Sequence, residues 1–199
     1  MLIMAPAKTI ITIRERAKHI FATRGYDGLS MRELAAESGV GISSIYHFFN
    51  DKDLLLKDIF DQTNTNLGDR RRVLPRRTTA EQMLKDRIAF QFEHMEDVVF
   101  VLKYYLHYRD DFMALPSKIL PPKAYLHIEE VLHMGISTGE FVMPSNQLEA
   151  QAKIITHSIN GFLLEYYPQI PKSAERAKLV TGLTTFVVRS LSNKEKPMQ

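Results

Sequence analysis

Apolar residues recur at intervals of three and four along most of the chain, and this spacing predicts amphipathic helices. One face of the first segment carries Ile10, Ile13, Ala17, Ile20 and Phe21. Gly25 follows a basic residue at the end of this segment and is predicted to close the helix in the left-handed conformation. No segment shows a convincing alternation of apolar and polar residues, so an all-α fold is predicted.

Two short helices are predicted next. Ser30 and Glu33 have the spacing of a capping box, in which Ser30 caps a helix and Glu33 reaches back to it. This helix ends near Gly39, and a glycine-containing turn leads to a second short helix over 42–48. Asp51 is placed to cap the helix that follows. Two short helices joined by a tight turn are the sequence form of a helix-turn-helix.

Longer helices are predicted after residue 51, because proline and glycine mark breaks between long periodic segments. Their approximate ranges are 52–74, 78–95, 97–114, 122–136, 146–167 and 172–192.

The region from about residue 10 to residue 59 resembles the DNA-binding domain of the TetR family of transcriptional repressors. The resemblance rests on Ile20, Phe21, Gly25, Tyr26, Ser30, Leu34, Ala35, Gly39, Val40, Ile45, Tyr46, Phe49, Lys52 and Leu55. Two positions depart from the family pattern: Gly41 replaces the usual capping Ser or Thr, and Ser43 stands where Gly is frequent. The resemblance implies a three-helix helix-turn-helix DNA-binding domain over 1–51 and a helical effector-binding and dimerisation domain over 52–199.

Candidate DNA contacts lie on the second short helix. One side of it carries Ile42, Ile45 and Phe49, and its predicted anchors are Val40, Ile45 and Phe49. This leaves Ser43, Ser44 and His47 on the outward side. The resemblance implies that Tyr46 and His47 contact phosphates. The competing interpretation is that the serines are only solvated and that Tyr46 packs in the core.

Two further candidates lie outside this helix. Lys52 begins the next helix, where its charge and the helix N-terminal amides both favour a phosphate. Arg32, on the preceding short helix, is a weaker candidate, with an ordinary solvated position as the alternative.

Composition adds little to this interpretation. Among 199 residues there are 26 Lys and Arg against 23 Asp and Glu, so the net charge of +3 does not by itself indicate nucleic-acid binding. The absence of cysteine excludes disulfides and thiol catalysis. No apolar run is long enough to span a membrane, and the N-terminus does not resemble a signal peptide, so a cytoplasmic protein is expected.

An effector site is predicted among the aromatic and methionine-rich middle helices, with Met95, Tyr105 and Tyr108 as candidate lining residues. The alternative is that these side chains only pack. No cofactor is expected, and a metal site is not, because the histidines of this region lack partners at ligand spacing. The arginines at 70–72 and at 76–77 could hold a phosphate or an anionic effector. They follow Lys52 by about 18 residues along a helix, which places them away from the DNA groove. This separation favours the interpretation that they form a solvated helix face and loop.

The final two helices are predicted to form a homodimer, because they carry more apolar residues than one face buries. These residues are Leu148, Ile154, Ile155, Ile159, Phe162, Leu163, Val180, Leu183, Phe186, Val187, Val188 and Leu191. The expected function is a repressor that binds a palindromic double-stranded DNA operator as a dimer and is released by a small, largely apolar effector. The alternative is a DNA-binding module whose C-terminal domain binds a protein partner. An enzyme is not expected, since no nucleophile or phosphate-loop motif is present.

Overall fold

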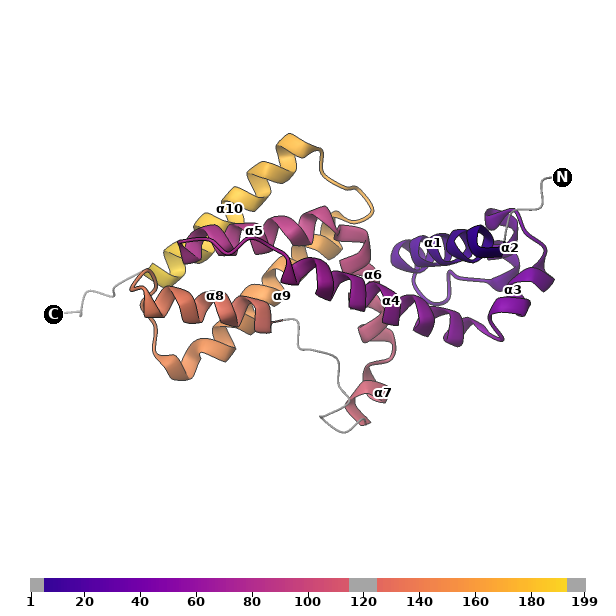
Figure 1. Cartoon of the computed structure of the whole chain (residues 1–199), viewed down its shortest axis with the longest axis horizontal. Coiled ribbons are helices and arrows are strands. Elements are labelled where there is room, and N and C mark those ends of the chain that lie inside the picture. Colours follow the sequence, from indigo (N-terminus) through magenta and orange to yellow (C-terminus); the bar gives the residue numbers. More distant parts are fainter. Residues whose placement is uncertain (1–5, 115–124, 193–199) are drawn as a thin grey trace. The chain divides into compact units, whose positions relative to one another are not determined.

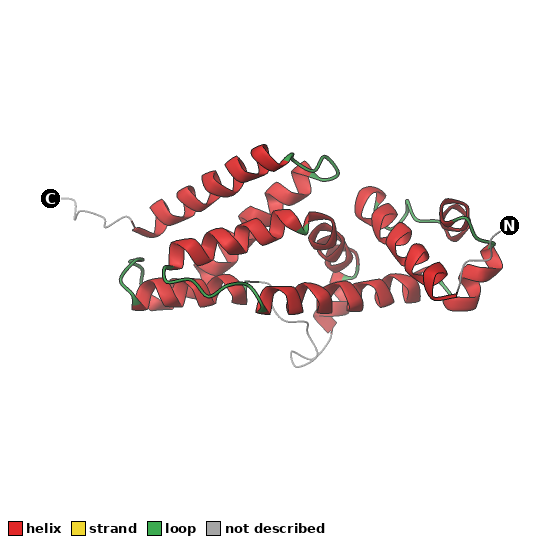
Figure 2. Cartoon of the chain, turned by 45° about the horizontal axis from the view of Figure 1, so that its top comes forward, coloured by secondary structure: helices red, strands yellow, loops and turns green. Residues whose placement is uncertain are grey.

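A computed structural model describes residues 6–114 and 125–192 (Figure 1). Within these two ranges the regular structure is helical and no strand occurs (Figure 2), which confirms the all-α prediction. None of the helices in the described ranges combines the length and the apolar character that crossing a membrane requires. The chain divides into two compact units: unit 1 contains residues 1–69 and 96–114, and unit 2 contains residues 70–95 and 115–199.

Unit 1 begins with three helices: α1 (Pro6–Arg24), α2 (Met31–Ser38) and α3 (Ile42–Phe48). The predicted end of α1 and the predicted bounds of α2 and α3 are confirmed. Gly25 has φ of 77° and Gly39 has φ of 66°, so both glycines adopt the left-handed backbone that ends a helix. Ser30 Oγ accepts a hydrogen bond from the Glu33 amide at 3.2 Å.

The second half of the predicted capping box is wrong. The carboxylate of Glu33 binds the Arg24 guanidinium at the end of α1 instead of returning to the Ser30 amide. An ion pair with a guanidinium outcompetes a hydrogen bond to a neutral amide because both partners are charged. This contact ties α1 to α2.

The core of unit 1 joins α1 to α4 (Lys52–Arg72) and α6 (Met95–His107). Ile13, Ala17, Ile20 and Phe21 are almost fully buried. Phe21 meets Phe100 of α6 edge to face, with ring centroids 5.3 Å apart. At the margin, Lys18 pairs with Asp97 at 2.8 Å and Arg14 with Asp58 of α4 at 2.7 Å.

Helices α5 (Ala80–Glu93), α8 (Leu126–Ser137), α9 (Leu148–Tyr166) and α10 (Ser173–Ser192) form the body of unit 2. A 3-10 turn, Ser145–Gln147, precedes α9. Helix α5 packs against α8, α9 and α10, and α8 also packs against α9 (Figure 1). Fully buried apolar residues on these helices, which form the core, include Leu84, Ile88, Phe92, Val131, Leu132, Ile159 and Leu163.

The segment after α8 is fixed by two contacts. The Glu140 carboxylate accepts hydrogen bonds from the Ala80 amide, at 2.8 and 3.0 Å, and so caps α5. Phe141 is buried against Gly135 of α8, where a Cβ atom on the glycine would lie 2.0 Å from the phenyl ring. Gly135 therefore makes room for the ring.

The predicted helix over 97–114 is wrong as a single element. The chain forms α6 and then α7 (Arg109–Ala114), with a break at Tyr108. Asp110 and Asp111 lie in the first turn of α7, where acidic side chains favour a new helix start. The breaks predicted near Pro75, at 137–145 and at 168–171 occur, and those predicted at Leu115–Pro116 and 120–122 lie outside the described residues.

Candidate functional site

Helix α3 is held by two buried side chains. Ile45 is completely buried and Phe49, directly after the helix, is 7% exposed. Ile42, which was predicted to share this apolar face, is 43% exposed because it lies in the first turn, ahead of the buried Ile45. Gly41 occupies the N-cap position without a side-chain hydrogen bond. The support of this seven-residue helix therefore depends on Ile45 and Phe49.

The opposite flank of α3 is accessible. Ser43 and His47 are exposed, Tyr46 is 49% exposed, and Ser44 is half-buried. The Tyr46 ring therefore does not belong to the core. Serine hydroxyls, an imidazole and a phenol are all able to hydrogen-bond to base edges or phosphate oxygens.

Lys52 lies at the start of α4 and is half-buried. Its Nζ donates a hydrogen bond to the Tyr26 carbonyl at 3.0 Å and lies 3.6 Å from the centroid of the Tyr26 ring. An ammonium group has three N–H donors, so donors remain for a phosphate. Arg32 is exposed on α2.

A polar cluster beside Lys52 was not predicted from the sequence. The hydroxyls of Tyr26 and Tyr108 each donate to Asp53 Oδ1 at 2.7 Å. These bonds lower the pKa of Asp53, and the hydrogen bond to Asp53 together with burial raises the pKa of Tyr26 to about 12. The His107 ring stacks on Tyr26 with centroids 4.0 Å apart. The cluster links the α1–α2 connector, the first turn of α4 and the end of α6 within unit 1.

The three residues predicted to line an effector site make different contacts. Tyr108 belongs to the cluster around Asp53. Tyr105 packs perpendicular to Phe60, with centroids 5.2 Å apart, and burial raises its pKa to about 12. Met95 is buried at the start of α6. None of the three lines the cavity described next, and their role in ligand binding stays a prediction.

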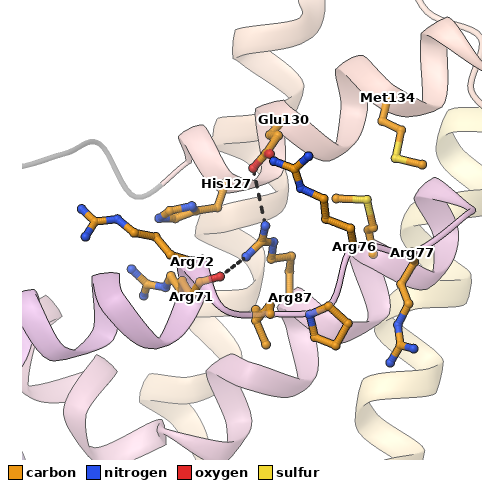
Figure 3. Close-up of a pocket in the computed structure, with 11 residues that line it drawn as sticks. Arg71, Arg72, Arg76, Arg77, Arg87, His127, Glu130 and Met134 are labelled. Atoms are coloured by element: carbon orange, nitrogen blue, oxygen red, sulfur yellow. Dashed lines mark hydrogen bonds and ion pairs between the residues drawn. The ribbon is translucent and has the colours of Figure 1, made fainter.

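Unit 2 contains a cavity of about 540 Å³ (Figure 3). This volume lies within the range of small-molecule sites. It is lined by the end of α4, the connector to α5, and residues of α5 and α8. The lining residues are Arg71, Arg72, Leu74, Pro75, Arg76, Arg77, Met83, Arg87, His127, Glu130 and Met134.

Positive charge dominates this cavity. Arg87 donates to the Arg71 carbonyl at 2.9 Å and pairs with Glu130 at 3.5 Å, as Figure 3 shows. Burial and the neighbouring Arg87 charge lower the pKa of Arg71 to about 10. Burial, together with Arg71, Arg87 and Arg72, lowers the pKa of His127 to about 4. The imidazole is therefore neutral at pH 7, and the arginines carry the charge.

The arginine run is thus more than the solvated face that its position in the sequence favoured. The sequence showed the charges, but it did not show that α5 contributes Arg87 or that α8 closes the cavity. Across the two described ranges, no three His, Asp or Glu side chains are grouped as a metal ion would require.

Comparisons with known proteins show which family the N-terminal region is similar to. The sequence model of the family described as bacterial regulatory proteins, tetR family, matches residues 13–59. No curated protein matches the chain.

Solved structures share the fold. A TetR-family transcriptional regulator from Agrobacterium tumefaciens has 17% identity and a TM-score of 0.68, with 95% of this chain and 100% of that chain covered. A regulatory protein of the tetR family from Rhodococcus has 15% identity and a TM-score of 0.68, with coverage of 94% and 99%. The TetR-family regulator PfmR from Thermus thermophilus has 17% identity and a TM-score of 0.65, with coverage of 91% and 99%.

These matches confirm the resemblance that the N-terminal residues indicated. The matched region contains most of α1 and all of α2 and α3, and the similarity in fold extends over nearly the whole chain. Residues 13–59 thus match the tetR family over the helix-turn-helix region, and the all-α fold of the chain is the one that these TetR-family structures have.

Proposed function

We propose that the protein is a transcriptional repressor that binds a palindromic DNA operator as a homodimer and is released by a small effector. The observation that carries the proposal is the exposed polar flank of α3, held by the buried Ile45 and Phe49 within the region that matches the family. A helix that enters the major groove must be anchored to the domain by buried side chains on one face and must present polar side chains on the opposite face.

The roles of individual residues follow from their positions. Ser43 and Ser44, in the first turn of α3, are proposed to contact base edges. Tyr46, His47 and Lys52 are proposed to bind phosphates, and Arg32 to support them from α2. Phosphate contacts position the protein and base contacts specify the sequence, so the two groups have different expected effects when substituted.

The test starts from selection of binding sites out of random duplex DNA, which supplies an operator. Ser43→Ala and Ser44→Ala are expected to change the preferred bases, whereas His47→Ala is expected to weaken all sequences alike. Lys57→Ala is a suitable control, because Lys57 is exposed on α4 and pairs with Asp61 within the same helix. If the α3 variants select the same operator with unchanged affinity, α3 is not the recognition helix.

Dimerisation is proposed through α9 and α10. Most apolar residues of these helices belong to the core, but Ile154 is 57% exposed, Phe162 37% and Phe186 70%. Gly161 directly precedes Phe162, and Gly182 lies one helical turn before Phe186. Added Cβ atoms on these glycines would have no atom within 4 Å, so the surface is open to close approach. A two-fold dimer matches a palindromic operator.

Sedimentation at micromolar concentration tests the dimer. Phe186→Asp is expected to shift the equilibrium to monomer, because a charge would enter an apolar interface. Val73→Asp provides a control at another exposed apolar position, 81% exposed on the α4–α5 connector. A wild-type monomer would contradict this part of the proposal.

Release by an effector requires that the ligand bind two conformations with different affinity. Helix α4 is the proposed link, since it begins at Lys52 and ends at Arg71 and Arg72 in the cavity lining. The alternative is that unit 2 binds a protein partner and no small molecule. A small molecule that raises the melting temperature of the protein and lowers its affinity for the operator would support effector release over binding of a protein partner.

A further inference from the structure

The cavity of unit 2 carries charge that the surrounding side chains do not balance. Five arginines line it against one carboxylate, that of Glu130. Arg77 pairs with Asp86 outside the lining at 2.6 Å, so one arginine is compensated there. The Arg87 guanidinium pairs with the Glu130 carboxylate, but their N–O distance of 3.5 Å is long for a charged hydrogen bond.

Two of the arginines have no carboxylate partner in the described residues. Arg71 lies over the Phe90 ring, 5.4 Å from its centroid, and Arg87 is its charged neighbour. Arg76 is exposed on the α4–α5 connector and extends toward α8 on the side of Glu130 and Met134 (Figure 3). Like charges in a partly buried site repel each other, and a bound anion would remove that repulsion.

The remaining lining is apolar. Leu74, Pro75, Met83 and Met134 contribute hydrocarbon and thioether surface, and His127 is neutral at pH 7. Methionine side chains adapt to irregular ligands. The site thus combines guanidinium groups, which can bind the anionic group of a ligand, with an adaptable apolar surface that can contact the ligand's apolar part.

We infer that this cavity binds an amphiphilic organic anion, with a carboxylate, sulfonate or phosphate head held by Arg71, Arg76 and Arg87 and an apolar body against Met83 and Met134. The inference rests on the proposed effector response and names the chemical class of the effector. Guanidinium groups bind such heads through two parallel hydrogen bonds, which a neutral isostere cannot replace.

Two fluorescent probes that share an aromatic body test the inference on the full-length protein. Anilinonaphthalene sulfonate is anionic, and N-phenyl-1-naphthylamine is neutral. The variant Arg76→Gln removes an unpaired charge from an exposed position and keeps the fold, which a thermal melt verifies. Lys85→Gln makes the same charge change at an exposed position of α5 outside the lining.

We expect Arg76→Gln to weaken the sulfonate about tenfold, as loss of a charged hydrogen bond does, and to leave the neutral probe within about twofold. Lys85→Gln should change neither, and straight-chain carboxylates from hexanoate to dodecanoate should displace the sulfonate better than their amides. Equal effects of the two variants, equal competition by acids and amides, or displacement of the sulfonate by random duplex DNA would overturn the inference.

The same samples separate this inference from the proposed function. Operator affinity is measured with and without the best displacing carboxylate. A carboxylate that binds with the expected dependence on Arg76 and leaves operator affinity unchanged supports the anion site and contradicts effector release. If Arg76→Gln does not weaken binding of the sulfonate or the carboxylate and the protein still binds its operator, the anion site is contradicted. The proposed DNA-binding function is not affected by that result.

Discussion

Helix α3, the proposed recognition helix, and the cavity of unit 2, the proposed anion site, present different polar residues. The accessible flank of α3 has no lysine or arginine, and its polar groups are Ser43, Tyr46 and His47. The cavity has five arginines. A search for a DNA-binding surface by charge density alone would therefore select the cavity and not α3, the proposed recognition helix.

The difference follows from what each ligand requires. A base-reading helix must fit a groove closely, so small polar side chains on a rigid support are favoured and long flexible cations are placed at its margins. A small anion has few contacts, so its site needs several convergent charges shielded from water. Rigid support under α3 and charge convergence in unit 2 are therefore the two properties to perturb.

The largest expected effect comes from removing the support of α3. Ile45→Ala should lower the free energy of unfolding by about 3 kcal/mol, because it leaves a cavity beneath the helix. His47→Ala, an exposed position on the same helix, should stay within about 0.5 kcal/mol of wild type. Denaturant titration followed by circular dichroism measures both. Equal stability of the two variants would show that α3 does not depend on its buried anchor.

A smaller effect is expected from the half-buried imidazole of His127 in the cavity. Because the pKa of His127 falls from 6.5 to about 4 on folding, the unfolded chain binds the proton more tightly. Its contribution is fully present above pH 6.5 and is lost as the pH falls toward 4. The charged groups that line the cavity with it are Arg71, Arg72, Arg76, Arg77, Arg87 and Glu130.

For a fully buried group this shift would cost about 2 kcal/mol between pH 7 and pH 5, and solvent screening of the half-buried imidazole reduces the cost. His127→Gln should therefore reduce the acid destabilisation over this range by about 1 kcal/mol. His133→Gln, at an exposed position on the same helix, controls for the loss of an ordinary imidazole. Unfolding free energies of the three proteins at both pH values provide the measurement. Parallel pH profiles for all three would mean that burial and the neighbouring arginines do not hold His127 neutral.

The smallest effect concerns salt and separates the two regions directly. Lys52→Ala should weaken all DNA sequences and reduce the slope of log affinity against log salt by about one unit, since one phosphate contact is lost. Arg76→Gln should leave that slope unchanged, because its charge serves the cavity. Operator affinities measured over a range of salt concentrations decide this. A reduced slope for Arg76→Gln would extend the DNA-binding surface to the arginine cluster.

The local structure of residues 6–60 was predictable because its signals are local. Gly25, Ser30, Gly39 and Asp51 act on the backbone within a few positions, and the structure places each at the predicted helix end. The Glu33 contact was mispredicted because its real partner, Arg24, lies outside the capping motif. The capping motif alone does not show whether a charged residue elsewhere, here Arg24, will bind the Glu33 carboxylate more strongly than the Ser30 amide does.

The cavity could be predicted only in part. The arginines at 70–72 and 76–77 are visible in the sequence, and four of them line the cavity together with Arg87. The cavity itself depends on α8, which follows about fifty residues later. Likewise, the Tyr26–Asp53–Tyr108 cluster joins residues that no local pattern connects. The apolar residues of α9 and α10 could not be divided between core and surface from spacing alone, and Phe186 is distinguished from Val187 only by the packing.

The close approach of Phe141 to Gly135 has a consequence for the evolution of this chain. With the Cβ position of residue 135 occupied by the phenyl ring, alanine at that site is incompatible with phenylalanine at 141 unless α8 shifts. The two sites should therefore change together in related sequences: glycine with a large aromatic ring, or a larger residue at 135 with a small one at 141. Because Glu140 caps α5 from the neighbouring position, a shift of this segment would also remove that cap. The pair 135 and 141 is thus expected to covary, with the acidic residue at 140 retained in both combinations.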